Sequence, residues 1–170
     1  MKMLGPNSVS HYTFYLFRLI AIGTVLLFLF ICISFLTGNF EVVNHRYGID
    51  VPFFGTQITG DYKANVIITI SLGLCFAAIF FYLLSNIFLA LKEKGIFNKK
   101  AITNLKFFTI LNLIIGPILY LLIHFPIMQK TNFGDIHNLI LHLILGMISL
   151  FVLHIFKNGY LVQSENDLTI

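Results

Sequence analysis

Apolar residues fill four long stretches of the chain, and each stretch is free of Asp, Glu, Lys and Arg. The stretches cover residues 19–40, 64–91, 107–129 and 136–156, which are 22, 28, 23 and 21 residues long. A helix needs about 20 apolar residues to cross a hydrocarbon core roughly 30 Å thick. The pattern therefore predicts four transmembrane helices, over residues 12–38, 64–92, 99–128 and 135–161.

The connections between these helices are mostly short, which predicts one all-α membrane domain over residues 1–170, folded as an antiparallel four-helix bundle. The exception is the loop 38–63, with four glycines and a proline. Its pieces "FEVVN" and "GIDVPFF" alternate weakly between apolar and polar residues, which is consistent with a short hairpin. An irregular cap over the bundle is the favoured interpretation of this loop, and a ligand-sensing role is a further alternative.

Composition and charge agree with a membrane protein and predict its orientation. Hydrophobic residues make up 58% of the chain and charged residues only 11%, which is more apolar than a water-soluble domain. Short loops rich in Lys and Arg stay on the cytoplasmic side. Eight basic residues fall on the side of the two termini and three on the other, so we expect both termini, the loop 92–106 and the tail 162–170 in the cytoplasm and the loop 38–63 outside. The net charge of +4 then reports orientation in a plasma membrane, and direct nucleic-acid binding is not expected.

Small residues and a proline predict how the helices pack. Pro117 lacks a backbone donor and should distort the third helix at the preceding turn. Gly73, Ala77, Ala78 and Gly146 are small enough to let neighbouring helices approach closely.

The predicted spans contain no Asp or Glu. Proton-coupled transport and intramembrane proteolysis commonly use a carboxylate at membrane depth. The chain also lacks the H-E-x-x-H, G-x-S-x-G and phosphate-loop motifs. The sequence thus favours a protein that is not an enzyme and carries no cofactor.

Three histidines give the alternative hypothesis. His124 lies near the outer end of the third span, and His137 and His142 lie at the outer start of the fourth. Imidazole is a common ligand of metals and of haem, so these residues could form a small metal- or haem-binding redox site. Histidines held by hydrogen bonds or at the membrane interface are the competing interpretation.

A second polar group is expected near the inner ends of the four helices, where structural hydrogen bonds between helices are its default role. A small cavity open to the cytoplasm is the alternative. Its members are Arg18, Asn86, Asn112 and His154.

The basic loop before the third helix has the features of a helix start. Asn98 is a favoured N-cap, and Phe97 and Ile102 are spaced to form a hydrophobic staple. Lys99 and Lys100 then fall in the first turn, where the helix dipole disfavours cations by some tenths of a kcal/mol. Orientation and anionic lipids suffice to explain these lysines, and an acidic partner surface is the competing explanation.

On the same side we expect a short polar tail. Gly159 is predicted to end the fourth helix, and the tail then carries Glu165, Asp167 and the terminal Ile170. Such a tail could fold back on the basic loop or dock on another protein.

These two places contain a specific set of residues: Gly95, Phe97 and Leu105 in the loop, and Gly159, Leu161, Glu165, Asn166, Asp167, Leu168 and Thr169 at the end. Through them the chain resembles the small bacterial membrane proteins grouped as domain of unknown function 2975. Asn98 stands where that family usually has Thr, and Ser164 where it often has Glu. The four-span plan extends the resemblance over nearly the whole chain.

The resemblance implies a biological context and no enzymatic activity. Members of that family are often encoded beside a small helix-turn-helix regulator, which implies membrane-linked control of transcription. We therefore expect a non-enzymatic accessory protein of the bacterial inner membrane that binds such a cytosolic partner. Its docking face would be formed by the basic loop and the tail, and assembly into homo-oligomers is left open.

Overall fold

The computed structural model describes residues 8–53, 55–92, 97–134 and 136–167. The first two predicted spans are α1 (Val9–Thr37) and α2 (Ala64–Lys92), and the fourth is α5 (Ile136–Asp167). The third span is divided into α3 (Lys99–Ile110), η1 (Leu111–Ile115), α4 (Gly116–Leu122) and η2 (Ile123–Ile127). Four helices of the expected kind are confirmed, and the first three begin and end within three residues of the predicted bounds.

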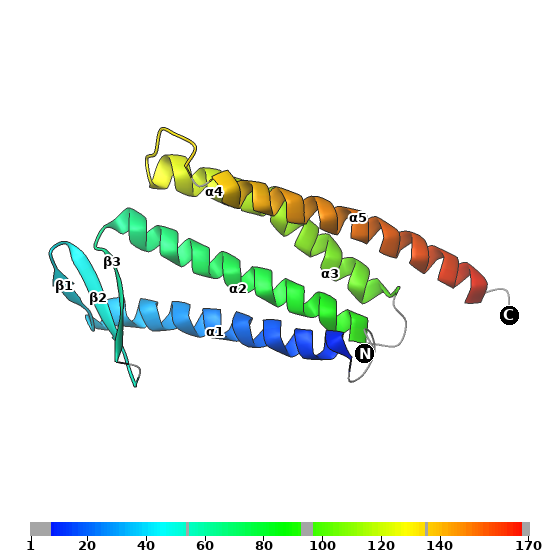
Figure 1. Ribbon diagram of the computed structural model, residues 1–170, viewed down its shortest axis with the longest axis horizontal. Helices are drawn as coiled ribbons and strands as arrows, with labels where there is room; N and C mark the ends of the chain where they lie inside the picture. The colour runs from blue at the N-terminus through cyan, green and yellow to red at the C-terminus, as the bar shows by residue number, and fades with distance from the viewer. Residues whose placement is uncertain (1–7, 54, 93–96, 135, 168–170) are drawn as a thin grey trace.

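The helices lie side by side in an antiparallel arrangement (Figure 1). α1 packs on α2, α2 packs on α3, and α3 packs on α5. The chain enters and leaves the bundle at the same end, which we call the terminal end. The opposite end carries strands that follow α1, and we call it the sheet end.

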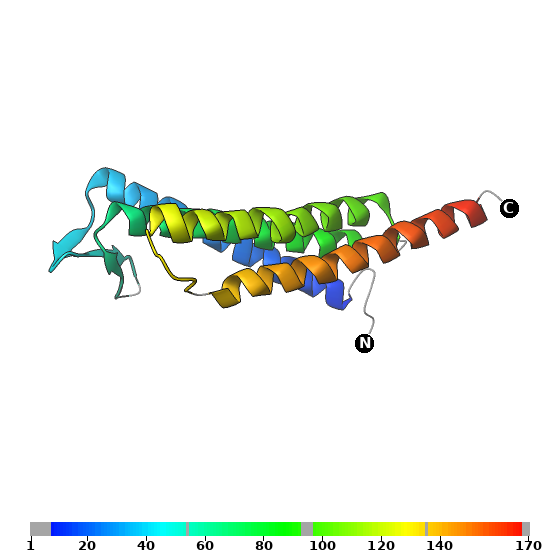
Figure 2. The same cartoon turned by 90° about the horizontal axis from the view of Figure 1, so that it is seen from above.

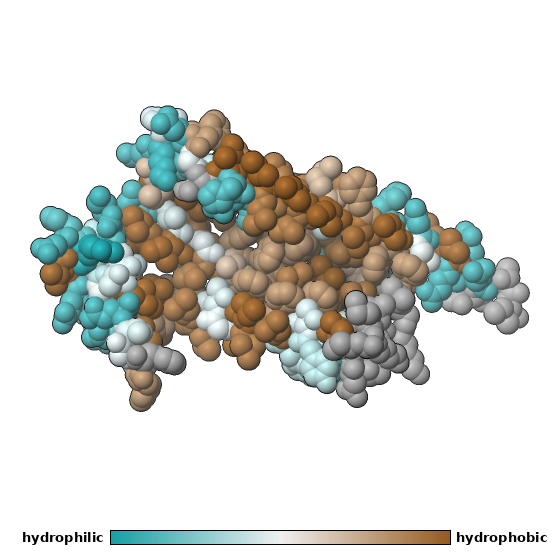
Figure 3. All heavy atoms as spheres, in the orientation of Figure 1, coloured by the Kyte–Doolittle hydropathy of each residue, from teal (hydrophilic) through white to brown (hydrophobic). Residues whose placement is uncertain are grey.

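All four spans in the described part of the chain are long and apolar enough to cross a membrane. Large apolar side chains are exposed along them, for example Leu19 at 72% and Phe151 at 66%. Figure 3 shows a broad hydrophobic surface over the middle of the bundle, with hydrophilic residues gathered towards both ends. In water such a surface would drive association, whereas the lipid of a membrane would cover it.

The loop between α1 and α2 folds into a three-stranded antiparallel sheet, so the favoured interpretation as an irregular cap was wrong and the all-α class was incomplete. Its strands are β1 (Glu41–Val43), β2 (Arg46–Val51) and β3 (Thr56–Asp61), in the order β1-β2-β3. Asn44 and His45 connect β1 to β2 with φ of 51° and 61°. Two successive positive φ values are typical of the tight turn that matches the twist of a hairpin.

Two side chains of β2 attach the sheet to the bundle. Tyr47 and Ile49 are 2% and 1% exposed, and with Ile31 they form a compact apolar cluster at the sheet end. Burial raises the pKa of the Tyr47 hydroxyl, so this group stays neutral at physiological pH. Alternation along one strand thus supplies the residues that close this end of the bundle.

The third span departs from α-helical geometry at two π-helical turns. In η1 the N–H of Gly116 bonds the carbonyl of Leu111, and in η2 the N–H of Met128 bonds the carbonyl of Ile123, each a step of five residues. Pro117 is the second residue after the first turn, and Pro126 lies inside the second turn. The distortion expected before Pro117 is confirmed, and its form is a widened turn.

The glycines expected at close helix contacts behave differently. A Cβ atom at Gly146 would lie 2.5 Å from the side chain of Leu113, so α5 and η1 can approach only because this residue is glycine. A Cβ atom at Gly73 would meet no atom within 4 Å. The expectation of a close contact is therefore confirmed at Gly146 and wrong at Gly73.

The fourth helix is longer than expected. It continues through Gly159 to Asp167, so residues 162–167 are the last turns of α5 and not a separate tail. Ile170, the last residue of the predicted docking face, lies outside the described residues.

A glycine in β3 provides a test of the sheet. A Cβ atom at Gly60 would lie 2.8 Å from the ring of the buried Tyr47. We expect Gly60→Ala to lower the free energy of unfolding by about 1–3 kcal/mol, because the ring has no room to move, and thermal unfolding in detergent measures the change.

The matched control is Gly48→Ala in β2. There the nearest atoms belong to Gln57, at 3.3 Å, and this side chain is exposed and can shift. Equal stability of the two variants would show that the sheet does not pack on the bundle through Tyr47.

Candidate functional site

At the terminal end, one amide side chain joins α2 to α3. Asn98 Oδ1 accepts a hydrogen bond of 2.8 Å from the N–H of Ala101, which confirms it as the N-cap of α3. Asn98 Nδ2 donates one of 3.0 Å to the carbonyl of Ala90, in the last turn of α2. The same residue therefore satisfies a free donor at one helix end and a free acceptor at the other.

The residue before this cap ties the start of α3 to α5. The ring of Phe97 lies 5.4 Å from the ring of Phe156, centre to centre, in an edge-on arrangement. A Cβ atom at Gly159 would lie 2.7 Å from Phe97. Gly159 was expected to end the helix, but it lies within α5 and makes room there for the Phe97 ring. The staple between Phe97 and Ile102 stays a prediction.

Two lysines border a cleft beside this cap. The cleft has a volume of about 440 Å³ and lies between the last turns of α2 and the first two turns of α3; Lys99, Lys100, Thr103 and Asn104 line its α3 side. Lys99 Nζ is 5.9 Å from the centre of the Tyr160 ring, within the range of a cation–π contact. The structure thus brings Phe97 and Lys99 next to α5, and Lys100 lies with Lys99 at the cleft between α2 and α3.

The acidic members of the predicted docking face lie farther along α5. The end of α5 projects beyond the other helices (Figure 2). Glu165 is exposed in its last turns, and Asp167 is its last residue. From Tyr160 to Asp167 the helix advances about 10 Å, at 1.5 Å per residue. The acidic residues therefore extend past the level of the lysine cleft.

The inner polar group is only partly assembled. Arg18 donates a hydrogen bond of 2.5 Å to Asn86 Oδ1, and Asn104 Nδ2 donates one of 3.1 Å to the backbone carbonyl of Asn86. These bonds connect α1, α2 and α3. The other two predicted members are elsewhere, since Asn112 bonds His142 and His154 is exposed.

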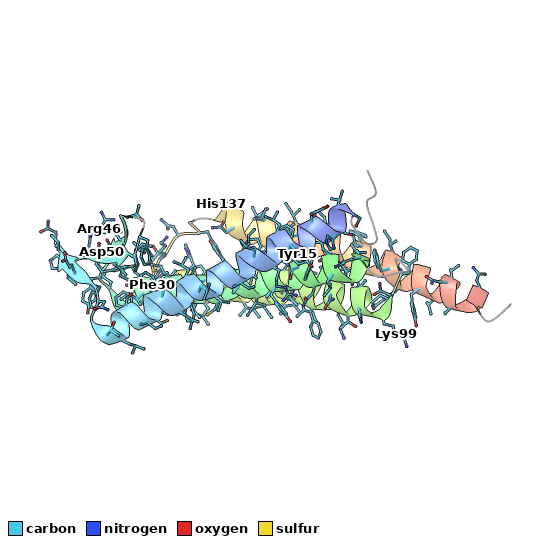
Figure 4. All side chains as sticks on the ribbon, turned by 90° about the horizontal axis from the view of Figure 1, so that it is seen from below. Tyr15, Phe30, Arg46, Asp50, Lys99 and His137 are labelled. Atoms are coloured by element: carbon cyan, nitrogen blue, oxygen red, sulfur yellow. The ribbon has the colours of Figure 1, made fainter. Side chains whose placement is uncertain are left out.

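The outer histidines do not form one cluster. His137 is exposed at the start of α5 and lies far from Lys99, towards the sheet end (Figure 4). The described residues contain no group of three or more His, Cys, Asp or Glu side chains placed to hold a metal ion. A metal or haem site made by all three histidines is therefore not assembled in this part of the chain.

His124 serves the loop that leads to α5. It is 4% exposed, its Nε2 contacts the carbonyl of Asn132, and its ring stacks on Tyr120 with centres 5.3 Å apart. The Tyr120 hydroxyl donates a hydrogen bond of 2.6 Å to the carbonyl of Gly134. Two side chains of the third span thus hold the loop in place.

His142 faces the middle of the bundle. Its Nδ1 lies 2.9 Å from Oδ1 of Asn112, a residue that is fully buried in η1. Its ring also lies edge-on to Phe76 of α2, with centres 5.0 Å apart. His142 and His124 line the same cavity, of about 450 Å³, between α2, the third span and α5. The sequence marked these two histidines, but it gave no sign that Thr69 joins them there.

The double cap predicts the behaviour of Asn98 variants. Asn98→Ala loses both hydrogen bonds, and we expect it to lower the free energy of unfolding by about 1–2 kcal/mol. Asn98→Asp keeps the N-cap acceptor and loses only the donor to Ala90, so we expect a smaller loss. Thermal unfolding gives the order, and hydrogen exchange at Ala101 should accelerate in Asn98→Ala only. Similar exchange at Ala101 in both variants would contradict the double cap.

Comparison with known proteins adds no relative to this geometry. No family model matches the chain, and neither the curated proteins nor the solved structures contain a significant match. The resemblance to domain of unknown function 2975 therefore stays a prediction.

Proposed function

We propose that the protein is a non-enzymatic regulatory accessory of the bacterial plasma membrane, with its terminal end in the cytoplasm. The four apolar spans support the membrane part of this proposal. The excess of basic residues on the side of the termini supports the orientation. At its cytoplasmic end the protein would hold a cytosolic protein partner.

The observation that carries the proposal is the lysine cleft. Lys99 and Lys100 are exposed at the first turn of α3, where the helix dipole disfavours positive charge. The Asn98 cap and the contact of Phe97 with α5 hold this turn in a defined position. A preorganised basic cleft of this kind favours an acidic segment of a partner, because little conformational freedom is lost on binding.

The projecting end of α5 supplies the second half of the docking face. Leu161 and Val162 are 56% and 58% exposed, next to the polar turn that contains Glu165. A partner placed against this helix would meet apolar and acidic groups, and one placed in the cleft would meet lysines. A helix-turn-helix regulator, the partner that the resemblance implies, would need an acidic segment for the cleft and a second surface that fits α5.

Charge reversal tests this proposal. We expect the double variant K99E/K100E to recover about tenfold less cytosolic partner than the wild type when the tagged protein is purified in a mild neutral detergent, because two attractive contacts become repulsive. The adjacent helix-turn-helix regulator, if encoded beside this gene, is the partner to measure by immunoblot.

Lys106→Glu is the matched control, since Lys106 is an exposed lysine of the same helix that does not line the cleft. It should leave recovery unchanged. Equal recovery with wild type and K99E/K100E, or an equal loss with Lys106→Glu, would refute docking at the cleft.

A further inference from the structure

The cavity near the sheet end has the size and lining of a small-molecule site inside the bundle. Its volume of about 450 Å³ lies within the range of ligand pockets. Apolar side chains such as Phe76, Leu119 and Ile123 form most of its wall. Polar groups reach it from α2, from the third span and from α5. It is separate from the lysine cleft, and nothing below depends on docking there.

The hydrogen bonds of Asn112 determine which nitrogen of His142 carries the proton. Asn112 Nδ2 donates to the carbonyl of Phe108 at 2.9 Å, so its Oδ1 is left as an acceptor. His142 Nδ1, at 2.9 Å from that oxygen, must then be the donor. In the neutral ring Nε2 is consequently an unprotonated acceptor, and among the described residues no hydrogen bond to it is found.

Thr69 lines the α2 wall of the cavity, and its hydroxyl is buried there. Five threonines in the described helices bond the carbonyl four residues earlier, namely Thr13, Thr24, Thr37, Thr103 and Thr109. Thr69 does not follow them: its Oγ1 is buried and has no hydrogen-bond partner among the described residues. An unpaired buried hydroxyl costs about 1–3 kcal/mol, and a bound molecule with an oxygen atom would remove this cost.

Two glycines leave space in this cavity that larger side chains would fill. A Cβ atom at Gly116 would lie 3.2 Å from Cγ of His142, so the glycine lets the imidazole lie against the third span. Gly73 lines the cavity, and a Cβ atom there would meet nothing within 4 Å. Glycine residues on the third span and on α2 therefore keep this cavity open.

We infer that this cavity binds an uncharged, membrane-soluble molecule that carries a hydroxyl group on an apolar ring or chain. The ligand hydroxyl donates to His142 Nε2 and accepts from the Thr69 hydroxyl, while its apolar part lies against Phe76. The unprotonated Nε2 presents a lone pair, which disfavours an anion beside His142. Among the described lining residues Lys130, in the loop before α5, is the one lysine, and there is no carboxylate to attract a cation.

Equilibrium dialysis of the full chain in lipid nanodiscs tests this inference, with 1-naphthol as the probe and empty nanodiscs as the background. We expect one saturable site per chain for 1-naphthol. 1-Methoxynaphthalene has a similar shape but no donor, and it should bind about tenfold more weakly, the factor that corresponds to one hydrogen bond. Binding no greater than to empty nanodiscs, or equal binding of the two probes, would overturn the inference.

Two variants locate the site. Gly73→Leu places a side chain in the cavity and should abolish saturable binding. Gly23→Leu is the matched control, because Gly23 is also a helical glycine with nothing within 4 Å but does not line the cavity. Thr69→Val should weaken 1-naphthol binding severalfold. This variant still tests the site if thermal unfolding shows that Gly73→Leu is destabilised. Wild-type affinity in Gly73→Leu or in Thr69→Val would place the ligand elsewhere and refute the site.

Discussion

The hydrogen bond between Asn112 and His142 is the contact on which the packing of the second half of the bundle depends. Asn112 is fully buried, and its amide nitrogen already bonds the Phe108 carbonyl. Its oxygen therefore needs a donor from another helix, because an unsatisfied amide in an apolar interior is costly. Only a narrow range of positions of α5 brings His142 to that oxygen. Gly116 and Gly146 make the required approach possible, so the polar bond and the small residues specify one alignment together.

Other asparagines also connect helices. Asn86 Oδ1 accepts from Arg18 of α1, and Asn104 of α3 donates to the backbone carbonyl of Asn86 in α2. Asn98 joins the end of α2 to the start of α3. An amide offers both a donor and an acceptor, so one residue can satisfy two helices. Bonds of this kind contribute about 0.6 kcal/mol each on average in a membrane, and their larger effect is to define which helix faces meet. The two ends of the molecule differ. The sheet packs over an apolar cluster at one end, and the other end exposes lysines and the projecting end of α5.

Much of the fold could be predicted because hydrophobicity alone determines the spans. The length of each charge-free stretch gave the four helices, Pro117 indicated the distorted turn, and Asn98 indicated the start of α3. Contacts between residues distant in the sequence could not be predicted. Gly159 is a residue type that often ends a helix, but here it lies inside α5 and makes room for the ring of Phe97. The weak alternation of the loop 38–63 did not predict the three-stranded sheet, because the sheet depends on Tyr47 packing against the bundle. Thr69 could not be distinguished from the other helical threonines, because only the structure shows that its hydroxyl lacks the usual bond.

Which ring nitrogen of His142 carries the proton is the most direct test of its hydrogen bond to Asn112. That bond aligns α5 and leaves Nε2 as an acceptor in the cavity. The measurement is solid-state ¹⁵N NMR of the chain in lipid bilayers at neutral pH, with labelled histidine rings and with His142 assigned from the His142→Gln spectrum. The hydrogen bond predicts a proton on Nδ1, close to the Asn112 side chain, and an unprotonated Nε2. A proton on Nε2 with a bare Nδ1 would contradict it, because Asn112 Oδ1 would then have no donor.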